Sequence, residues 1–584
     1  MSGTSCLATP TSVSARYTLS GATQLAVVTP SSFVKRKQAK LELDGNDIKV
    51  QGPNVYWLGL DENLVPSPSY PSKSRVLEIM AVAKVMGATT IRSTSLGVSF
   101  GTGLSIENAL NTFKPDDSAA WDAIDFALLA ARSYGLRLVI PLTDQYDYYH
   151  GGIPTFLRWR NLSSTNFDPF YDLSSDTYSD FRRYIQALLT HTSPYTNLTL
   201  ATDPTVLAFE TGNELGGWTG KQYPPPVEWT TAISQYLKEL APETLVISGT
   251  YGVRKDELQV ETIDIHSDHY YPTYNSRLSS SAETAHSAQK PFLVGEYDHT
   301  NQYYLRYRWG YFIVLIPALF ALSVWLMPKR WWPWRFTLRE LATCGCCCRK
   351  RRKKRRPDEG GYDRMGGTGG EAEIPSSTSM SPLADLSSKP STPCLDASTS
   401  TTAFPMLDSA ASTRFPPQHS SSPKRNRILD HPVRIHRWMF SLFILLLALP
   451  LFGAIYSYLP DPISSFLSSL SSLETQSSAS SPSAVGDLYW SLFGKTDSCC
   501  SYVQHDDSYT LHYPSDPSTT SGAARGSGES VAMLTKHAWK TRGETPFWAN
   551  EGFDIDKLRF EDLPVVACPQ AGLRLANGTV IGGN

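Results

Sequence analysis

The chain has 584 residues, 41% of them hydrophobic, 11% aromatic and 18% charged, and 53 Lys and Arg against 55 Asp and Glu leave a formal net charge of −2. The near-neutral balance argues against a nucleic-acid-binding protein, so no nucleic-acid partner is expected. The apolar and aromatic content excludes collagen-like, coiled-coil and wholly disordered classes.

The amino-terminal segment differs in composition from the rest of the chain. Residues 1–33 are rich in Ser and Thr, and Arg16 is their only charge. The apolar stretch Leu25–Val28 is too short for a signal-peptide core and no basic segment opens the chain, so we expect a disordered leader over 1–33. Short apolar stretches then alternate with amphipathic ones, which predicts a globular domain over 34–302.

Two uncharged apolar runs come next, 309–327 and 438–459. About 20 apolar residues cross a bilayer of about 30 Å as a helix, so we predict two transmembrane helices, with buried core helices as the alternative. The loop 328–437 between them is strongly basic over Arg349–Arg356, and excess Lys and Arg marks the cytoplasmic side. We therefore expect a plasma-membrane protein with loop 328–437 cytoplasmic and both flanking segments extracellular.

Cysteines and glycosylation motifs agree with this division. The expected cytoplasmic loop begins with a basic segment whose cysteines are candidates for S-palmitoylation, a metal site being the weaker alternative: Cys344, Cys346, Cys347 and Cys348. The expected extracellular part holds Cys499, Cys500 and Cys568, which allow one disulfide with undetermined partners. N-glycosylation motifs at Asn161, Asn197 and Asn577 also lie in segments expected outside.

The globular domain has a strand–helix rhythm. We expect strands at 48–57, 88–92, 136–142, 206–211, 244–248, 262–266 and 292–296, and helices at 74–86, 119–134, 178–190 and 226–240. This alternation implies parallel pairing. A doubly wound sheet is the rival, but it usually has a Gly-rich phosphate-binding turn after its first strand, and this sequence has none there.

Seven strands would leave a barrel open, with unsatisfied edges. An eighth strand is expected at Gly486–Gly494, beyond the apolar runs, with a helix near 529–540. The predicted fold class is therefore α/β, a (β/α)8 TIM barrel interrupted between strands 7 and 8 by a transmembrane helical hairpin with a disordered cytoplasmic loop. The insertion is placed at 303–484, strand 8 and the last helix at 485–550 and a tail at 551–584; a gene-model or fusion artefact is the competing explanation.

Two glutamates, Glu214 and Glu296, lie at the ends of expected strands four and seven. Catalytic groups of eight-stranded barrels cluster at the carboxyl ends of the strands. Glycoside hydrolysis requires two carboxyl groups across such a mouth, about 5–5.5 Å apart when the reaction retains configuration. We expect Glu214 to have a raised pKa, partly because of the charge of Glu296, so that it can donate a proton.

The strand-end motifs in order resemble glycoside hydrolase family 5, a retaining (β/α)8 family. Asn-Glu after strand four and Glu after strand seven are accompanied by Arg92 at the end of strand two and Trp490 on strand eight. The segments GPNVYWLG, TDQYDYYHGG and SDHYYP resemble in particular fungal and plant endo-β-1,4-mannanases. The resemblance covers about 34–302 and 485–550.

The resemblance implies a role for each matched residue. Glu214 would be the acid/base and Glu296 the nucleophile of a double displacement on a β-linked polysaccharide, with β-1,4-mannan favoured. The supporting residues would bind the sugar 2-hydroxyl (Asn213), keep the nucleophile ionised (Arg92), orient the carboxylates and the sugar (His269, Tyr271), form the platform beneath the cleaved unit (Trp490) and stack on a neighbouring sugar (Trp57). No cofactor or metal is expected, and the expected partners are the polysaccharide and the lipid bilayer.

Two departures leave the substrate open. The chain has IRSTSLG where mannanases have a VRVW-like segment, and YWSLFG instead of the commoner Trp-Gln form. A β-glucan-active hydrolase is therefore an alternative. Two further hypotheses are a membrane-tethered carbohydrate sensor without turnover, and a signalling or sorting role of the basic loop.

Overall fold

The computed structural model describes residues 19–20, 29–63, 67–93, 103–218, 222–302, 310–327, 336–337, 432–433, 436–457, 459–476, 478, 480–497, 501–503, 505, 507–513, 522–564, 566–567, 573–574 and 580–581. Most of the predicted leader and of the predicted cytoplasmic loop lies outside these residues. So do the four candidate palmitoylation cysteines, the three cysteines Cys499, Cys500 and Cys568, and Asn577. The chain divides into two compact units, Met1–Ile316 with Ala448–Asn584, and Pro317–Leu447.

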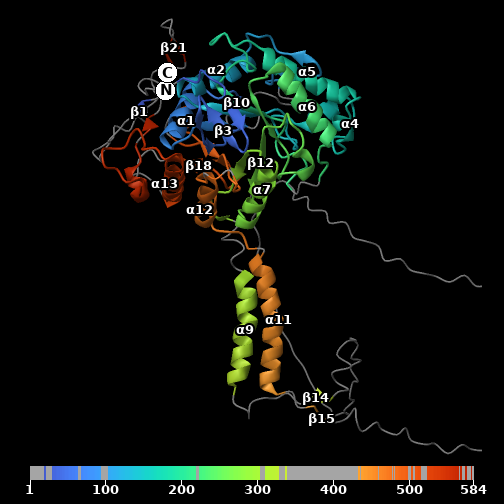
Figure 1. Ribbon diagram of the computed structural model, residues 1–584, viewed down its shortest axis with the longest axis vertical. Helices are drawn as coiled ribbons and strands as arrows, with labels where there is room; N and C mark the ends of the chain where they lie inside the picture. Colours follow the sequence, from blue (N-terminus) through green and yellow to red (C-terminus); the bar gives the residue numbers. More distant parts are fainter. Residues whose placement is uncertain are drawn as a thin grey trace, which may run out of the picture. The chain divides into compact units, whose positions relative to one another are not determined.

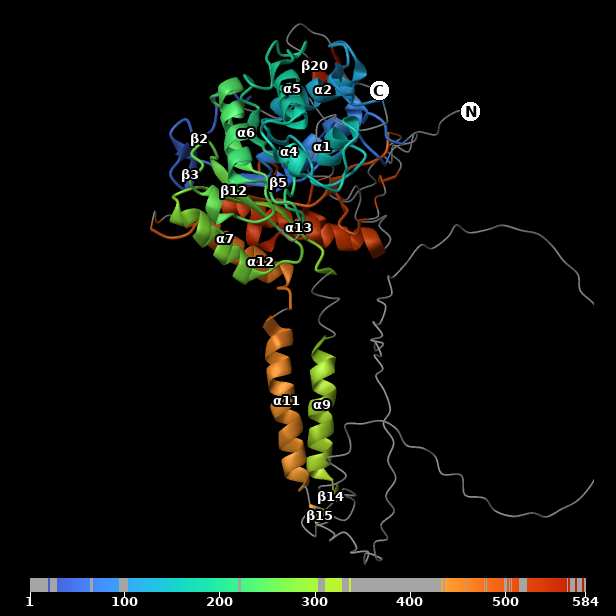
Figure 2. The ribbon, with the colours of Figure 1, turned by 90° about the vertical axis from the view of Figure 1, so that its right-hand side faces the viewer.

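The first unit is built on eight parallel strands (Figures 1 and 2). Their order in the sheet is β5-β16-β13-β12-β11-β10-β9-β6. The strands are β5 (Val50–Pro53), β6 (Thr90–Arg92), β9 (Arg137–Pro141), β10 (Val206–Glu210), β11 (Leu245–Ser248), β12 (Ile265–Tyr270), β13 (Phe292–Tyr297) and β16 (Gly486–Tyr489). The predicted (β/α)8 barrel is confirmed at this level.

Two contacts close the sheet into a barrel. The backbone N–H of Thr89 donates to Gln51 at 2.8 Å, and a parallel bridge joins Asn54 to Arg92, so the edges β5 and β6 meet. On the other side of β5, β16 pairs in register from Gly486 against Val50. A Cβ added at Gly486 would lie 1.8 Å from the Val50 carbonyl oxygen, so only glycine allows this approach. The strand that comes after the apolar runs in sequence thus lies between the first and seventh strands.

Helices connect most of the strands. They are α1 (Lys73–Val85), α2 (Ala119–Ser133), α3 (Ile153–Trp159), α4 (Asp168–Tyr171), α5 (Asp176–Thr190), α6 (Val227–Leu240), α7 (Asn275–Ser287), α12 (Ile463–Glu474) and α13 (Gly522–Arg542). Local sequence sets several ends: Ser72 and Ser175 accept hydrogen bonds from the first turns of α1 and α5. Gly135, at φ 62°, follows the last turn of α2.

Helix α12 lies inside the segment 303–484 that the sequence assigns to the insertion, yet it belongs to the barrel. Its buried residues include Phe466, whose ring lies 5.2 Å from that of Tyr270 and 5.6 Å from that of Tyr297. It therefore supplies the helix between β13 and β16. Its Ser-rich sequence hides the amphipathic pattern, because small polar residues occupy the exposed positions.

A small apolar cluster fills the end of the barrel at which the strands begin. It joins first residues of strands, such as Val50, Leu245 and Ile265, to Val34 and Leu41. Leu41 lies in the antiparallel sheet β2 (Lys35–Lys37), β3 (Lys40–Leu43) and β4 (Asn46–Asp47). Since this sheet packs at the amino ends of the strands, the carboxyl ends are left for a site.

The remaining elements are short. Paired strands are β1 (Leu19–Ser20) with β19 (Val566–Ala567), β7 (Glu107–Ala109) with β8 (Thr112–Phe113), β14 (Phe336–Thr337) with β15 (Pro432–Val433), β17 (Leu492–Phe493) with β18 (Leu511–His512), and β20 (Leu573–Arg574) with β21 (Val580–Ile581). Turns of 3-10 helix are η1 (Lys255–Glu257), η3 (Ile555–Lys557) and η4 (Phe560–Asp562). Of these, β17 and β18 continue beyond β16 toward the carboxyl end of the barrel.

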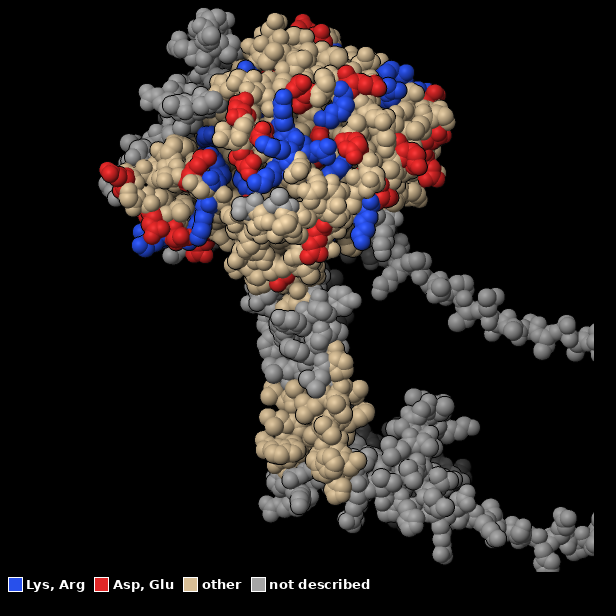
Figure 3. All heavy atoms as spheres, in the orientation of Figure 1, with Lys and Arg blue, Asp and Glu red and all other residues tan. Residues whose placement is uncertain are grey.

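The second unit contains most of α9 (Gly310–Leu326) and part of α11 (Arg437–Ser457). The Ser441 hydroxyl donates to the Ala321 carbonyl at 2.8 Å, so the helices pack side by side (Figures 1 and 2). The face of this unit in Figure 3 shows no charged side chain among its described residues. Helices thus form in place of both predicted spans.

The prediction of transmembrane helices is not supported. Over the described residues, no helix is both long and apolar enough to cross a membrane. The predicted contact with a lipid bilayer is therefore not supported either.

Candidate active site

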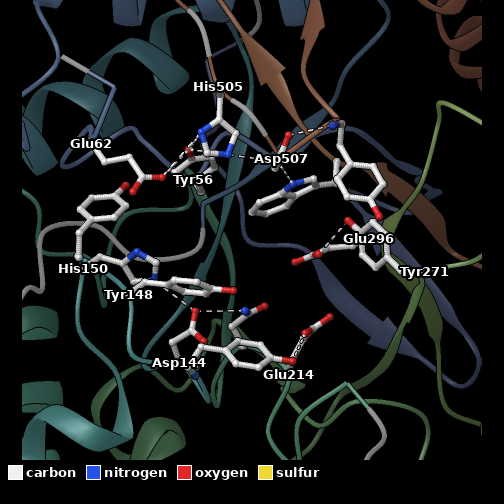
Figure 4. A pocket seen from close by; sticks show the side chains of 15 residues that line it. Tyr56, Glu62, Asp144, Tyr148, His150, Glu214, Tyr271, Glu296, His505 and Asp507 are labelled. Carbon is white, nitrogen blue, oxygen red and sulfur yellow. Dashed lines mark hydrogen bonds and ion pairs between the residues drawn. The ribbon is translucent and has the colours of Figure 1, made fainter. Parts of the chain in front are cut away.

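A cavity of about 430 Å³ lies at the carboxyl ends of the barrel strands (Figure 4). Its lining is acidic and aromatic, and among the described residues no Lys or Arg lines it. The carboxyl groups are Glu62, Asp144, Glu214, Glu296 and Asp507, and the aromatic rings include Tyr56, Tyr146, Tyr148, Tyr271, Tyr509 and Trp490. Planar rings with carboxylates suit a neutral polyhydroxylated ligand such as a sugar.

Glu296 is held from two sides in this cavity. Arg92 Nη1 donates to its Oε1 at 2.6 Å, and the Tyr271 hydroxyl donates to its Oε2 at 3.1 Å. Burial raises the pKa of Glu296 above its ordinary value, while the neighbouring His269 and Arg92 act in the opposite direction. Arg92 therefore favours the ionised form of Glu296, as expected, but its effect on the pKa is smaller than that of burial.

Arg92 is fully buried and uses its whole guanidinium group. Besides Glu296, it donates to Glu210 Oε2 at 2.8 Å, to Asn54 Oδ1 at 3.0 Å and to Asn213 Oδ1 at 2.8 Å. Burial acts to lower the pKa of Arg92, and the charges of Glu210 and Glu296 reverse this and raise it above its ordinary value. One cation thus fixes four side chains at the ends of three strands, β5, β10 and β13.

Glu214 follows β10 with a left-handed backbone, at φ 51°. Such a conformation is strained for a residue other than glycine and is found at functional sites. The Tyr146 hydroxyl donates to Glu214 Oε2 at 2.8 Å. Burial raises the pKa of Glu214 to about 7; the Tyr146 hydrogen bond opposes this rise and the Asp144 charge adds to it. Asp144, and not Glu296 as expected, is the carboxylate that contributes most to the rise.

His269 lies between the two glutamates. Its Nδ1 is 2.8 Å from Glu214 Oε1 and 3.6 Å from Glu296 Oε2. This nitrogen and one carboxyl oxygen of each glutamate lie within 4.8 Å of one another. Burial lowers the pKa of His269, so the neutral imidazole is favoured. Two carboxyl groups at this separation, one of them with a pKa of about 7, can act as a nucleophile and a proton donor on one bond.

Trp490 directly follows β16 and lines the cavity. Its ring is stacked on that of Tyr56, with centroids 5.3 Å apart and planes at 10°. Its Nε1 donates to Asp507 Oδ2 at 2.9 Å, which fixes the orientation of the indole. The ring is therefore rigidly held beside Glu296, where a platform for a sugar is expected.

Comparison with known proteins agrees with this geometry. Residues 31–278 match the family described as GH family 5 beta-mannosidase-like. The predicted resemblance to glycoside hydrolase family 5 is confirmed for this part of the chain.

Relatives and solved structures carry related names. Mannan endo-1,4-beta-mannosidase 2 of Oryza sativa subsp. japonica is 27% identical over 258 residues, 43% of this chain and 55% of the relative. Mannan endo-1,4-beta-mannosidase 2 of Arabidopsis thaliana is 26% identical over 226 residues, 38% of this chain and 49% of the relative. The chain thus spans about half the length of these relatives. The endo-1,4-beta-mannanase structure from Rhizomucor miehei has 21% identity and a TM-score of 0.40, covering 48% of this chain and 87% of that one.

One predicted sugar contact of this family 5-like domain is wrong. Trp57 is fully buried and does not line the cavity. Its Nε1 donates to the Leu492 carbonyl at 3.1 Å and the Arg75 guanidinium lies 4.6 Å from its ring centroid, so it packs in the core. Its neighbour Tyr56 lines the cavity instead; both residues lie in the turn that follows β5.

Several residues of the site, lining the cavity or, like Glu210, bound to Arg92, are missed by sequence reasoning. Asp144, Tyr146 and His150 come from the segment TDQYDYYHGG, which the resemblance marks as a whole without showing which side chains point inward. Glu210 is hidden as the last residue of an apolar strand. His505 and Asp507 come after the eighth strand, and no sequence pattern signals them.

Among the described residues, two groups of three side chains have a spacing that a metal ion could use: Glu214 with His269 and Glu296, and Glu474 with Asp487 and His537. In the first group both oxygens of each glutamate already accept or face protein donors, and the Arg92 cation lies alongside. This arrangement favours proton transfer over metal binding.

Proposed function

We propose that the barrel hydrolyses β-mannosidic bonds with retention of configuration, with Glu296 as nucleophile and Glu214 as acid/base. The single observation that carries this proposal is the placement of both carboxyl groups around His269, with oxygens within 4.8 Å of one another. That separation fits the close pair of a retaining enzyme and leaves no room for the water of an inverting one.

In the first step Glu296 attacks the anomeric carbon, and Glu214 gives its proton to the departing glycosidic oxygen. Arg92 and Tyr271 hold Glu296 in position through one oxygen each. Asn213 uses one amide N–H on Asp144, at 3.1 Å, and has a second for the 2-hydroxyl of the sugar. Trp490 supports the face of the ring.

In the second step Glu214 acts as a base. It removes a proton from water, which attacks the anomeric carbon and releases Glu296. A pKa of about 7 suits a group that must be protonated in one step and ionised in the next near neutral pH. Neutral His269 can keep its 2.8 Å contact between Nδ1 and Glu214 Oε1 in both protonation states of Glu214.

The mannan assignment is supported by the matched family and by the names of the relatives. A β-glucan-active hydrolase is the alternative, because the segment after Arg92 departs from the mannanase pattern. A carbohydrate sensor without turnover is less well supported, since such a protein would lack one carboxylate or its partner, whereas Glu214, Glu296 and Arg92 are all engaged here. We also propose an extracellular location for the barrel, as its glycosylation motifs suggest.

Two variants test the assignment of roles. Glu296→Ala should abolish hydrolysis of both β-mannan and an activated aryl β-mannoside. Glu214→Ala should lose about 10²–10⁴-fold on β-mannan but much less on the aryl substrate, because a good leaving group needs no proton. Asp147→Asn is the matched control, since Asp147 lies in the same loop as Asp144 but pairs with Arg158 outside the cavity. Equal losses of Glu214→Ala on both substrates would contradict the acid/base role.

A further inference from the structure

A network of polar side chains stands at one end of the cavity, and we call it the end wall. Tyr56, Glu62, His505 and Asp507 line the cavity (Figure 4), and Asn63 joins them through hydrogen bonds to Tyr56 and His505. The Tyr56 hydroxyl donates to Glu62 Oε1 at 3.1 Å, and His505 Nδ1 lies 3.0 Å from Asn63 Oδ1. His505 Nε2 lies 3.3 Å from Asp507 Oδ2. The wall therefore links the loop after β5 to the segment after β17, across the side of the site next to Trp490.

The positions of the end wall and of Glu214 indicate which part of the substrate lies on which side of the cavity. In the ring of eight strands, β10 lies opposite β16, four places along the order of the sheet. Glu214 follows β10, and the acid must be next to the departing oxygen, so the leaving part of the substrate lies on the β10 side. Trp490 follows β16, so the sugar that is transferred to Glu296 lies on the side of the end wall.

The departing side carries different side chains. Trp218, four residues after Glu214, is 63% exposed, and Tyr223 is 46% exposed. A bridge between Gly216 and Gln222 brings these two aromatic residues into one loop. Exposed aromatic rings next to a sugar site are suited to stack on further sugar units. The leaving part of the substrate can therefore extend over Trp218 and Tyr223, whereas the transferred part faces the end wall.

The chemistry of the end wall fits the terminal unit of a chain. A β-1,4-linked unit inside a chain has its C4 oxygen in the next glycosidic bond, whereas the unit at the non-reducing end has a free hydroxyl there. Glu62 and Asp507 present carboxylate oxygens, which accept hydrogen bonds from such hydroxyls. A further unit at that position would instead meet the wall.

We propose that this site releases single sugar units from the non-reducing end of a β-1,4-linked chain. The inference rests on the proposed function and adds its mode of action. Each turnover adds water across the terminal glycosidic bond, so the hydroxyl goes to the released monosaccharide and the proton to the shortened chain. The end wall selects the terminal unit, and the loop with Trp218 and Tyr223 binds the remainder.

The test uses the full chain and β-1,4-mannopentaose reduced at its reducing end. The early products should be mannose and reduced mannotetraose in equal amounts. Early mannobiose or mannotriose, with the matching shorter reduced products, would overturn the proposal while leaving the proposed function intact. Failure to hydrolyse both this substrate and an aryl β-mannoside, with wild type no better than Glu296→Ala, would instead remove the proposed function.

Two variants separate the two sides of the site. Trp218→Ala should lower kcat/KM on the pentasaccharide about threefold to tenfold and leave the aryl β-mannoside almost unchanged, since only the former reaches that loop. The double variant Glu62→Ala with His505→Ala should raise the share of products from internal bonds. An unchanged product pattern in a double variant with a native thermal unfolding curve would contradict the role of the wall. If that variant does not fold, Glu62→Gln alone should raise KM for the aryl substrate, and an unchanged KM would contradict it equally.

Discussion

The side-chain amide of Gln51 donates a 2.7 Å hydrogen bond to Glu474, and so joins the first barrel strand to α12 across 423 positions of sequence. The other oxygen of Glu474 accepts from Thr541 at 3.3 Å and lies 3.4 Å from His537 Nε2. Burial raises the pKa of Glu474 well above its ordinary value, and the charge of Asp487 adds to the rise. A protonated acid at this point ties α12 to β5 and to α13.

We therefore predict that two deletions will behave differently. Replacing residues 317–447 by a short Gly/Ser linker should leave a folded barrel, because this removes only the second compact unit. Removing 303–484 should prevent folding, because it takes α12 away and exposes the apolar surface around Tyr270 and Tyr297. Cooperative thermal unfolding of both proteins, followed by circular dichroism, distinguishes the outcomes; a folded barrel without 303–484 would show that α12 is dispensable.

Glu474 itself should contribute measurably to stability. Glu474→Ala should lower the free energy of unfolding by about 1–3 kcal/mol, because Gln51 and Thr541 then lose a buried partner. Ser472→Ala is the matched control, since Ser472 is exposed on the same helix and, among the described residues, its hydroxyl donates to the Ser468 carbonyl of the preceding turn. Urea titrations measure both, and an equal small effect would contradict the role of Glu474.

Arg92 should matter for folding as well as for activity. Arg92→Ala leaves Glu210 and Glu296 buried without their cation, which should cost about 3–5 kcal/mol of unfolding free energy. Arg92→Lys keeps the charge but cannot reach four acceptors, so its loss should be intermediate. Arg559→Ala removes a largely exposed partner of Asp562 and should change little. Equal stability of the Arg92 and Arg559 variants would contradict this network.

The pKa of Glu214 predicts the basic limb of the pH profile. The acid must be protonated in the first step, so kcat/KM on unactivated substrates should fall as pH rises through about 7. The Tyr146 hydrogen bond stabilises the ionised form, so Tyr146→Phe should move this limb to higher pH.

Tyr148→Phe is the control for that shift, because Tyr148 lines the same cavity and has no hydrogen bond to Glu214 among the described contacts. The basic limb of the pH profile of Tyr148→Phe should stay at the same pH as in the wild type. A limb that moves to lower pH in Tyr146→Phe would contradict the assignment of this titration to Glu214.

Glycosylation tests the proposed extracellular location. Asn161 and Asn197 are exposed at turns of the barrel unit, so both should carry glycans on protein secreted from a eukaryotic host. Ser163→Ala and Thr199→Ala should each remove one glycan without changing the asparagine. Peptide mass spectrometry measures occupancy, and unmodified asparagines on secreted protein would contradict the prediction.

Much of the barrel is predictable from sequence because its strands are short apolar runs between amphipathic helices. The boundaries of β12 are less so: 262–266 is expected and Ile265–Tyr270 is found. The polar residues Asp268 and His269 mark a strand end by pattern, but they remain in the strand because Arg277 and Glu214 satisfy them. Tertiary partners, which a sequence pattern cannot show, decide such a case.

The candidate site likewise contains some residues that the sequence predicts and others that it does not. Glu214, Glu296 and Arg92 stand at strand ends, and barrel geometry alone predicts that strand ends meet. The loop residues His505 and Asp507 have no such rule, because their place depends on the path of the chain after β17. The two apolar runs illustrate the limit of composition, since an uncharged run predicts a helix but does not fix how many of its residues the helix contains.

The central claim is double displacement at Glu296, and the configuration of the first product tests it most directly. Proton NMR of an aryl β-mannoside during early hydrolysis by the full chain should show the β-anomer of mannose before mutarotation yields the α-anomer. Glu296→Ala should form neither. Initial release of the α-anomer would contradict retention and, with it, the assignment of Glu296 as nucleophile.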